Sequence, residues 1–177
     1  MTILELFLIA VGLASDAFVV SITLGLKYQY LSLLNKLKIA LTFSALQVIM
    51  PMLGFLIAYN FNSQVTFLTK FISFIILSLI GLNMVINKEE ELNYNINLKN
   101  LLILGIATSL DAFAVGLSFA FLKVSMLISL TLIGFVTFLM CFIGPYLGNY
   151  FGSKISNKPQ VVGGIILIII GFKILIF

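Results

Sequence analysis

Long apolar stretches separated by short polar segments run along almost the whole chain. Each stretch has about 20 residues, the length that an α-helix needs to cross the hydrocarbon core of a bilayer. The ends of such segments can be placed to within about three residues. The pattern predicts six membrane-spanning helices: Ile3–Leu26, Lys36–Ala58, Thr66–Asn87, Leu98–Phe121, Met126–Tyr150 and Pro159–Phe177.

One connection between these stretches, residues 88–97, is strongly polar, and it divides the chain near its centre. Short matches relate residues 1–88 to residues 97–177. Three segments recur in the same order: Asp16-Ala17-Phe18 as Asp111-Ala112-Phe113, Pro51-Met52-Leu53-Gly54 as Pro145-Tyr146-Leu147-Gly148, and Ile75-Ile76-Leu77 with Gly81 as Ile165-Ile166-Leu167 with Gly171. A duplication explains this order better than chance similarity among apolar residues.

Three helices per half is an odd number, so the second half must enter the membrane from the opposite side. We therefore expect an all-α membrane protein with six transmembrane helices, arranged as two inverted three-helix repeats. Residues 1–177 would form a single transmembrane domain, with the polar loop 88–97 joining the halves.

Composition excludes an ordinary soluble domain, because apolar residues make up 62% of the chain, charged residues 9%, and the mean hydropathy is +1.23. The net charge of +4 comes from lysines in the loops. Seven of these lysines fall on one side of the six-helix arrangement: Lys27, Lys36, Lys38, Lys88, Lys99, Lys154 and Lys158. By the positive-inside rule that side is cytoplasmic. We expect a membrane protein with extracytoplasmic termini, in contact with lipid and without a nucleic-acid partner. Whether it forms a homo-oligomer stays open.

Two acidic residues, Asp16 and Asp111, lie deep in their predicted helices, each 13 positions after the helix start. An aspartate at the centre of a membrane helix costs about 2.5–3.5 kcal/mol on insertion scales. A shared ion-binding site near the middle of the membrane would explain this cost. Alternatively, each aspartate bonds a neighbouring hydroxyl and only holds helices together.

Hydroxyl residues share the faces of these aspartates. Thr23 and Ser118 each follow an aspartate by seven positions, and Thr108 precedes Asp111 by three. Residues at these spacings return to nearly the same face of a helix. Each hydroxyl could instead bond back to its own helix.

Proline adds backbone oxygens to the candidate site. A proline inside a helix removes the hydrogen bond to the carbonyl four residues earlier. Pro51 therefore removes the backbone hydrogen bond to the carbonyl of Gln47, and Pro145 removes the one to the carbonyl of Cys141. Such freed carbonyls can face a cavity and bind cations, or a neighbouring helix can repair the kink.

These groups together form a set of hard oxygen ligands. With no His and one Cys in the chain, the set suits Mn²⁺, Mg²⁺ or Ca²⁺ better than Zn²⁺ or Cu⁺. Two carboxylates balance one divalent ion. When the ion leaves, the neighbouring carboxylates favour taking up a proton, which gives a physical basis for cation/proton exchange. No nucleophile–base set or phosphate loop is present, so an enzyme is not expected.

At these residues the chain resembles the bacterial manganese efflux pump family (MntP-type), over essentially its whole length. The resemblance is strongest at residues 14–18 and 107–116. It implies a location in the bacterial cytoplasmic membrane, export of Mn²⁺ as the transported ion, no cofactor, and the family's intramembrane acidic roles for Asp16 and Asp111. The family commonly has a glutamate where this chain has Gln47. Two other functions stay open: a non-transporting scaffold or sporulation-associated membrane protein, and an exporter of a small organic cation or amino acid.

Overall fold

The computed structural model describes four long helices and the residues beside them. The described residues are 3–28, 31–58, 96–120 and 125–154, with the single positions Ile75, Ser78, Leu82, Ile165, Ile168, Ile169 and Phe172. The helices are α1 (Ile3–Lys27), α2 (Leu33–Ala58), α4 (Leu98–Phe119) and α5 (Met126–Lys154). All four are long and apolar enough to cross a membrane.

The first, second, fourth and fifth predicted spans are thereby confirmed as helices. The ends differ by up to four residues, because α5 continues past Tyr150 to Lys154 and α2 begins at Leu33 rather than at Lys36. The hydroxyl of Ser32 accepts a hydrogen bond from the backbone N–H of Asn35 at 3.3 Å, which caps α2 one turn earlier than the apolar pattern indicates. The predicted spans Thr66–Asn87 and Pro159–Phe177 lie, apart from the single positions, outside the described residues.

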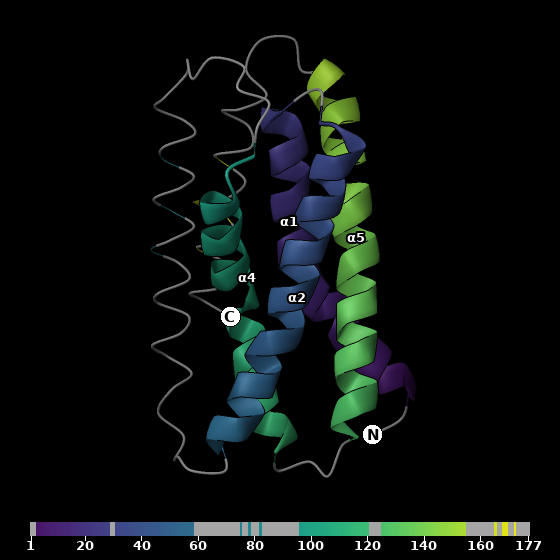
Figure 1. Ribbon diagram of the computed structural model, residues 1–177, viewed down its shortest axis with the longest axis vertical. Helices are drawn as coiled ribbons and strands as arrows, with labels where there is room; N and C mark the ends of the chain where they lie inside the picture. Colours follow the sequence, from purple (N-terminus) through teal and green to yellow (C-terminus); the bar gives the residue numbers. More distant parts are fainter. Residues whose placement is uncertain are drawn as a thin grey trace.

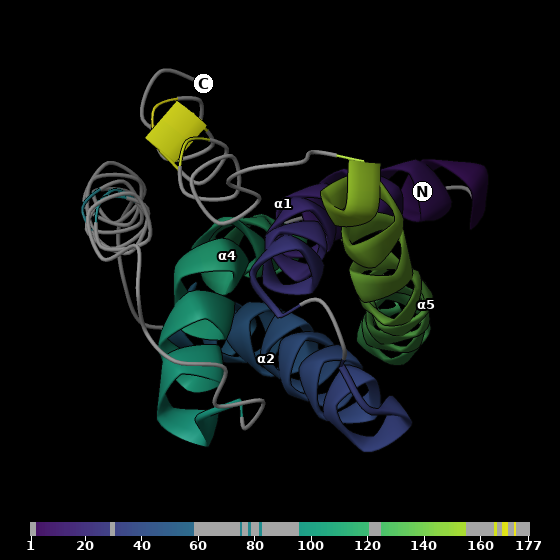
Figure 2. The ribbon, with the colours of Figure 1, turned by 90° about the horizontal axis from the view of Figure 1, so that it is seen from above.

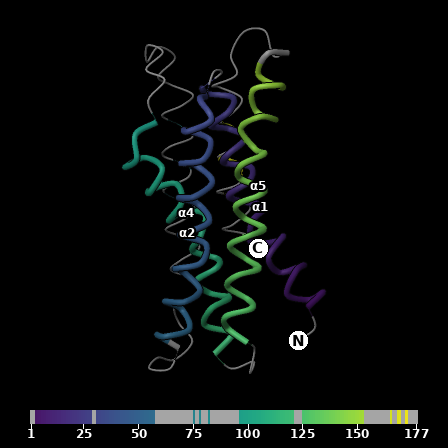
Figure 3. Tube along the Cα trace, turned by 45° about the vertical axis from the view of Figure 1, so that its right-hand side comes forward, coloured from purple at the N-terminus to yellow at the C-terminus, as the bar shows by residue number. Residues whose placement is uncertain are grey.

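The four helices pack as a bundle in which α1 and α5 run in one direction and α2 and α4 in the other (Figures 1 and 2). The most extensive contacts join α1 to α5 and α2 to α4, and α2 also packs on α5. The first turns of α1 lean away from the bundle (Figure 3), and Ile3, Leu4 and Leu8 are exposed there.

Glycines allow the closest approaches between helices. A Cβ atom on Gly54 of α2 would overlap the backbone of Phe113 in α4, and one on Gly148 of α5 would overlap the backbone of Ile22 in α1. Small residues at such contacts let membrane helices approach backbone to backbone. Each Pro-x-x-Gly segment therefore packs against a helix from the other half of the chain.

Both helices continue through their prolines, so the breaks predicted at Pro51 and Pro145 are limited to the loss of one backbone hydrogen bond each. Packing explains the continuity. Gly116 of α4 lies against the backbone of Pro51, and Gly25 of α1 lies against that of Pro145. Neighbouring helices thus hold the segment on both sides of each proline in line.

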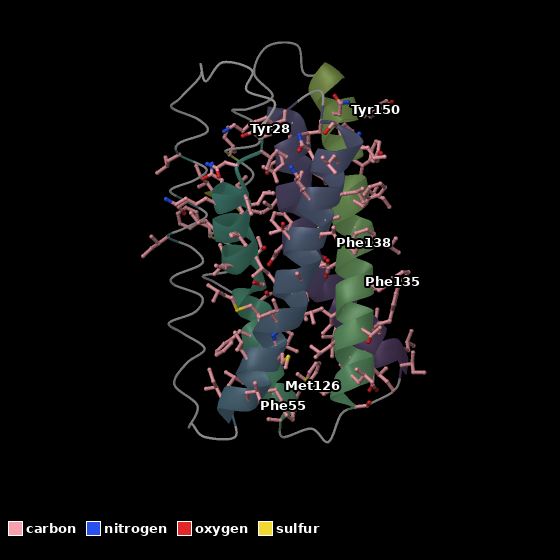
Figure 4. All side chains as sticks on the ribbon, viewed as in Figure 1. Tyr28, Phe55, Met126, Phe135, Phe138 and Tyr150 are labelled. Atoms are coloured by element: carbon pink, nitrogen blue, oxygen red, sulfur yellow. The ribbon has the colours of Figure 1, made fainter. Side chains whose placement is uncertain are left out.

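The described lysines gather at one end of the bundle, where α1 and α5 finish and α2 and α4 begin: Lys27, Lys36, Lys38, Lys99 and Lys154. Tyr28 and Tyr150 lie at this lysine end, whereas Phe55 and Met126 lie at the opposite end (Figure 4). The ammonium of Lys36 lies 3.5 Å from the ring centre of Tyr146, which links the start of α2 to α5 through a cation–π contact.

Candidate ion site in the middle of the bundle

Two separate apolar clusters fill the bundle, one toward each end. The lysine-end cluster contains Ala17, Val20, Leu24, Leu31, Ile39, Ala40, Phe43, Leu101, Leu104, Ala107 and Cys141. The opposite-end cluster contains Leu6, Ala10, Leu13, Ala14, Ala112, Phe119, Ile133 and Val136. Along each helix the chain passes from one cluster to the other near mid-length.

Polar residues occupy the level between the clusters on all four helices. We call this set the polar layer: Asp16 of α1, Gln47 of α2, Thr108, Ser109 and Asp111 of α4, and Thr137 of α5. All of them are buried except Asp111, which is half-buried. The residues of the polar layer therefore lie between the two apolar clusters.

Gln47 is fully buried and joins α2 to α1. Its Nε2 donates a hydrogen bond to the carbonyl oxygen of Leu13 at 3.0 Å, three residues before Asp16. Its Oε1 is buried and has no hydrogen-bond partner in the structure as described. A buried acceptor left unpaired costs about 1–3 kcal/mol. This amide oxygen is therefore available to a bound cation near the turn of α1 that carries Asp16.

The two aspartates come from helices that contact each other and run in opposite directions. Asp16 is 9% exposed. Oδ1 of Asp111 accepts a hydrogen bond from the backbone N–H of Ala112 at 2.7 Å, which holds that carboxyl group beside its own helix. Each of the two predicted acidic residues therefore lies between the two apolar clusters along its own helix.

The three predicted hydroxyl ligands differ in burial and in position along their helices. Thr108 lies in the polar layer and donates to the carbonyl of Leu104 at 3.1 Å, so its oxygen lone pairs stay available. Thr23 is buried and donates to the carbonyl of Val20 at 2.7 Å, but it lies two turns from Asp16 toward the lysine end.

Ser118 does not lie with the candidate site: it is exposed, and its hydroxyl donates to the carbonyl of Ala114 at 3.2 Å. Thr23 and Ser118, which the spacing predicts as a symmetric pair, therefore differ in burial, and a ligand role for Ser118 stays a prediction. Helical spacing relates Ser118 to Asp111, but burial depends on which neighbouring helices are present two turns further along α4.

Cys141 is fully buried in the lysine-end cluster, and its thiol forms a hydrogen bond with the hydroxyl of Ser21. That hydroxyl itself donates to the carbonyl of Phe18 at 2.7 Å. The Cys141 side chain therefore connects α5 to α1. A ligand role for its carbonyl oxygen, freed by Pro145, stays a prediction.

Sequence reasoning missed Ser109 and Thr137. Both are fully buried, and Ser109 donates to the carbonyl of Gly105 at 2.7 Å. Thr137 corresponds to the apolar Phe43 in the first half, so a search for symmetric polar pairs passes over it. The available signal was its position one turn before Cys141, on the face that carries Pro145 and Gly148.

Four long apolar helices around a buried layer with two carboxyl groups define a multi-pass α-helical membrane protein with a polar centre. The family model described as "Putative manganese efflux pump" matches residues 30–175. The chain belongs to this bacterial MntP family, whose members are described as efflux pumps and not as enzymes.

Similar proteins cover nearly the full length of the chain. A "Putative manganese efflux pump MntP" of Desulfitobacterium hafniense is 46% identical over 98% of this chain and 94% of its own length. The proteins of the same name from Acetivibrio thermocellus and Gloeothece citriformis are 42% and 41% identical, each over 99% of this chain and over 91% and 96% of their own lengths. No solved structure matches the chain significantly.

Proposed function

We propose that this protein exports Mn²⁺ across the bacterial cytoplasmic membrane and binds the ion in the polar layer. The observation that carries the proposal is the position of buried carboxyl and amide oxygens between two apolar clusters. An ion bound there is closed off from both membrane surfaces. The names of the relatives support manganese as the ion, and hard oxygen ligands without His suit it chemically.

In this proposal Asp16 and Asp111 supply the two negative charges that balance one divalent ion. Oε1 of Gln47 adds a neutral oxygen beside Asp16, and Thr108 adds another from α4. The carbonyl oxygens of Gln47 and Cys141, which lose a hydrogen-bond donor to the prolines, complete the oxygen set.

Proton exchange follows from the same charges. Two neighbouring carboxylates without their ion repel each other in a medium of low dielectric constant, so the empty site favours proton uptake. The proton gradient can then drive export, because protons enter on the aspartates after Mn²⁺ leaves.

We also propose that residues 1–177 form one transmembrane domain of six helices, as two inverted repeats, 1–88 and 97–177, joined by residues 88–97. The opposed directions of α1 and α4, and of α2 and α5, support this arrangement. The related glycines support it too, since Gly54 packs near Leu117 and Gly148 near Ile22, which are equivalent positions in the two halves. Alternating access then requires the two apolar clusters to open in turn.

The positive-inside rule orients the protein with its lysine end in the cytoplasm and its termini outside. Mn²⁺ would therefore enter the polar layer through the lysine-end cluster and leave through the opposite-end cluster. Thr23, buried on the lysine side of Asp16, lies along this entry route.

Expression in a manganese-sensitive bacterium that lacks its own exporter tests the proposal. Cell-associated manganese should fall with the wild type and stay high with Asp16→Asn or Asp111→Asn. Glu5→Gln is the matched control, because Glu5 is an exposed acid in the first turn of α1, away from the polar layer. Unchanged manganese with the wild type, or full protection by both aspartate variants, would contradict the proposal.

A further inference from the structure

Two buried side-chain oxygens in the four described helices have no hydrogen-bond partner: Oε1 of Gln47 and Oγ1 of Thr137. Both residues are fully buried. Buried polar atoms are normally paired, and an exception needs an explanation such as a ligand. Oε1 of Gln47 already belongs to the proposed cation site, and Thr137 has no assigned role.

Thr137 behaves differently from the other buried hydroxyl groups of these helices. A hydroxyl inside a membrane helix usually donates a hydrogen bond to a carbonyl one turn earlier in the same helix. That bond is made by Ser21, Thr23, Thr108, Ser109 and Ser129. Thr137 does not make it, so its oxygen keeps its full bonding capacity inside the bundle.

Helix register places Thr137 at the level of Gln47 and Asp16. Ser21 of α1 faces Gly144 of α5, and the two helices run in the same direction. Seven residues before Ser21 is Ala14, and seven residues before Gly144 is Thr137. Ala14 and Thr137 therefore lie at the same level. Ala14 is two residues from Asp16, about 3 Å along the helix axis. It is also next to Leu13, whose carbonyl accepts the hydrogen bond from Gln47.

The contact between α2 and α5 gives the same level independently. A Cβ on Gly134 of α5 would meet a methyl of Val48, 2.7 Å away. Since α2 and α5 run in opposite directions, Thr137 lies level with Ala45, about 3 Å along the axis from Gln47. Phe138, the residue after Thr137, lies near the middle of α5 (Figure 4).

We infer that Thr137 is a ligand-binding residue of the central site, and that its hydroxyl oxygen joins Oε1 of Gln47 as a neutral ligand for a hard divalent cation. The inference rests on the proposed function and adds a side-chain oxygen of α5 to the backbone carbonyl of Cys141, which the proposed site already takes from that helix. A hydroxyl oxygen is a hard ligand without charge. Thr137 therefore contributes to affinity for the ion and leaves the charge balance with Asp16 and Asp111 unchanged.

Thr137→Val tests this role, because valine keeps the shape of threonine and removes the oxygen. The measurement is thermal unfolding of the purified full-length protein in detergent, first without metal and then titrated with MnCl₂. Without metal the variant should be at least as stable as the wild type, since a buried unpaired oxygen has been removed. Half-maximal stabilisation should need at least about ten times more Mn²⁺ than in the wild type. Even substitutions of residues that only orient a metal ligand lower metal affinity about ten- to hundredfold.

Two further variants make the test specific. Thr137→Ser keeps the hydroxyl and should restore most of the wild-type response to Mn²⁺. Thr131→Val makes the same chemical change on the exposed side of α5, where the hydroxyl donates to the carbonyl of Leu127 at 2.8 Å, and should leave the response unchanged.

The outcomes separate this inference from the function on which it rests. If the wild type responds to Mn²⁺ and Thr137→Val responds at the same concentrations, the role of Thr137 is wrong and the proposed function stands. If the wild type shows no response to Mn²⁺, both the binding function and the role of Thr137 are contradicted.

Discussion

The side-chain nitrogen of Gln47 lies 3.0 Å from the carbonyl oxygen of Leu13, and this hydrogen bond ties the centre of α2 to the turn of α1 that carries Asp16. The bond fixes which way the amide points. Because Nε2 bonds to α1, the other end of the amide, Oε1, stays buried without a hydrogen-bond partner among the described residues. In the proposed site Gln47 therefore supplies a neutral side-chain oxygen.

Gln47→Glu should make the protein depend on metal for its stability. The variant loses the donor to Leu13 and places a third carboxylate in the polar layer. An uncompensated buried charge costs about 3–5 kcal/mol, so unfolding in EDTA should occur at a lower temperature than for the wild type. Added Mn²⁺ should recover more stability than it adds to the wild type. A Gln47→Leu variant, neutral and without the oxygen, should show no such gain. Equal responses of all three proteins would contradict a ligand role for this position.

Gly54→Ala and Gly148→Ala should each destabilise the bundle. The added Cβ meets the backbone of Phe113 in the first case and of Ile22 in the second, and neither backbone can move aside cheaply. Overpacking of this kind costs about 1–3 kcal/mol. Thermal unfolding in detergent measures the effect. Gly12→Ala is the matched control, since nothing lies within 4 Å of its Cβ position. Unchanged stability of both test variants would show that these helices separate more easily than their packing indicates.

Pro51→Ala and Pro145→Ala distinguish the two interpretations of the prolines. Each substitution restores an N–H that can bond the carbonyl of Gln47 or of Cys141. If those carbonyls bind the ion, the variants should fold as well as the wild type and need more Mn²⁺ for half-maximal transport into inverted vesicles. Unaltered transport would assign the prolines a packing role only, against Gly116 and Gly25.

The orientation of the bundle predicts which cysteines an impermeant thiol reagent can reach in intact cells. In a Cys141→Ala background, Glu5→Cys should react, because the proposed orientation places the start of α1 outside the cell. Lys38→Cys, at the lysine end of α2, should react only after the cells are broken open. The reverse pattern would invert the proposed direction of transport. Cys141 itself is fully buried and should react slowly in the wild type.

Hydropathy was sufficient to predict α1, α2, α4 and α5, because a bilayer demands long apolar segments whatever their packing. It did not locate the start of α2, which depends on a local cap by Ser32. Cap geometry involves one hydroxyl and one N–H, and it leaves little trace in a hydropathy pattern.

The candidate site was only partly predictable. Asp16 and Gln47 stand out because polar groups are costly in apolar helices, and both are buried in the polar layer. Ser118 followed from helical spacing alone and is exposed, since spacing carries no information about neighbours. Thr137 has no polar counterpart in the first half of the chain, so it stands out only through its burial and its unpartnered oxygen.

Purified protein in proteoliposomes gives the most direct test of Mn²⁺/proton exchange at the two aspartates. A fluorescent indicator reports Mn²⁺ flux, and a pH-sensitive dye reports protons in the same vesicles. We predict that a Mn²⁺ gradient drives protons in the opposite direction, and that Asp16→Asn and Asp111→Asn abolish both fluxes. Absence of Mn²⁺ flux with the wild type, or Mn²⁺ flux that persists in both variants without proton movement, would contradict the account.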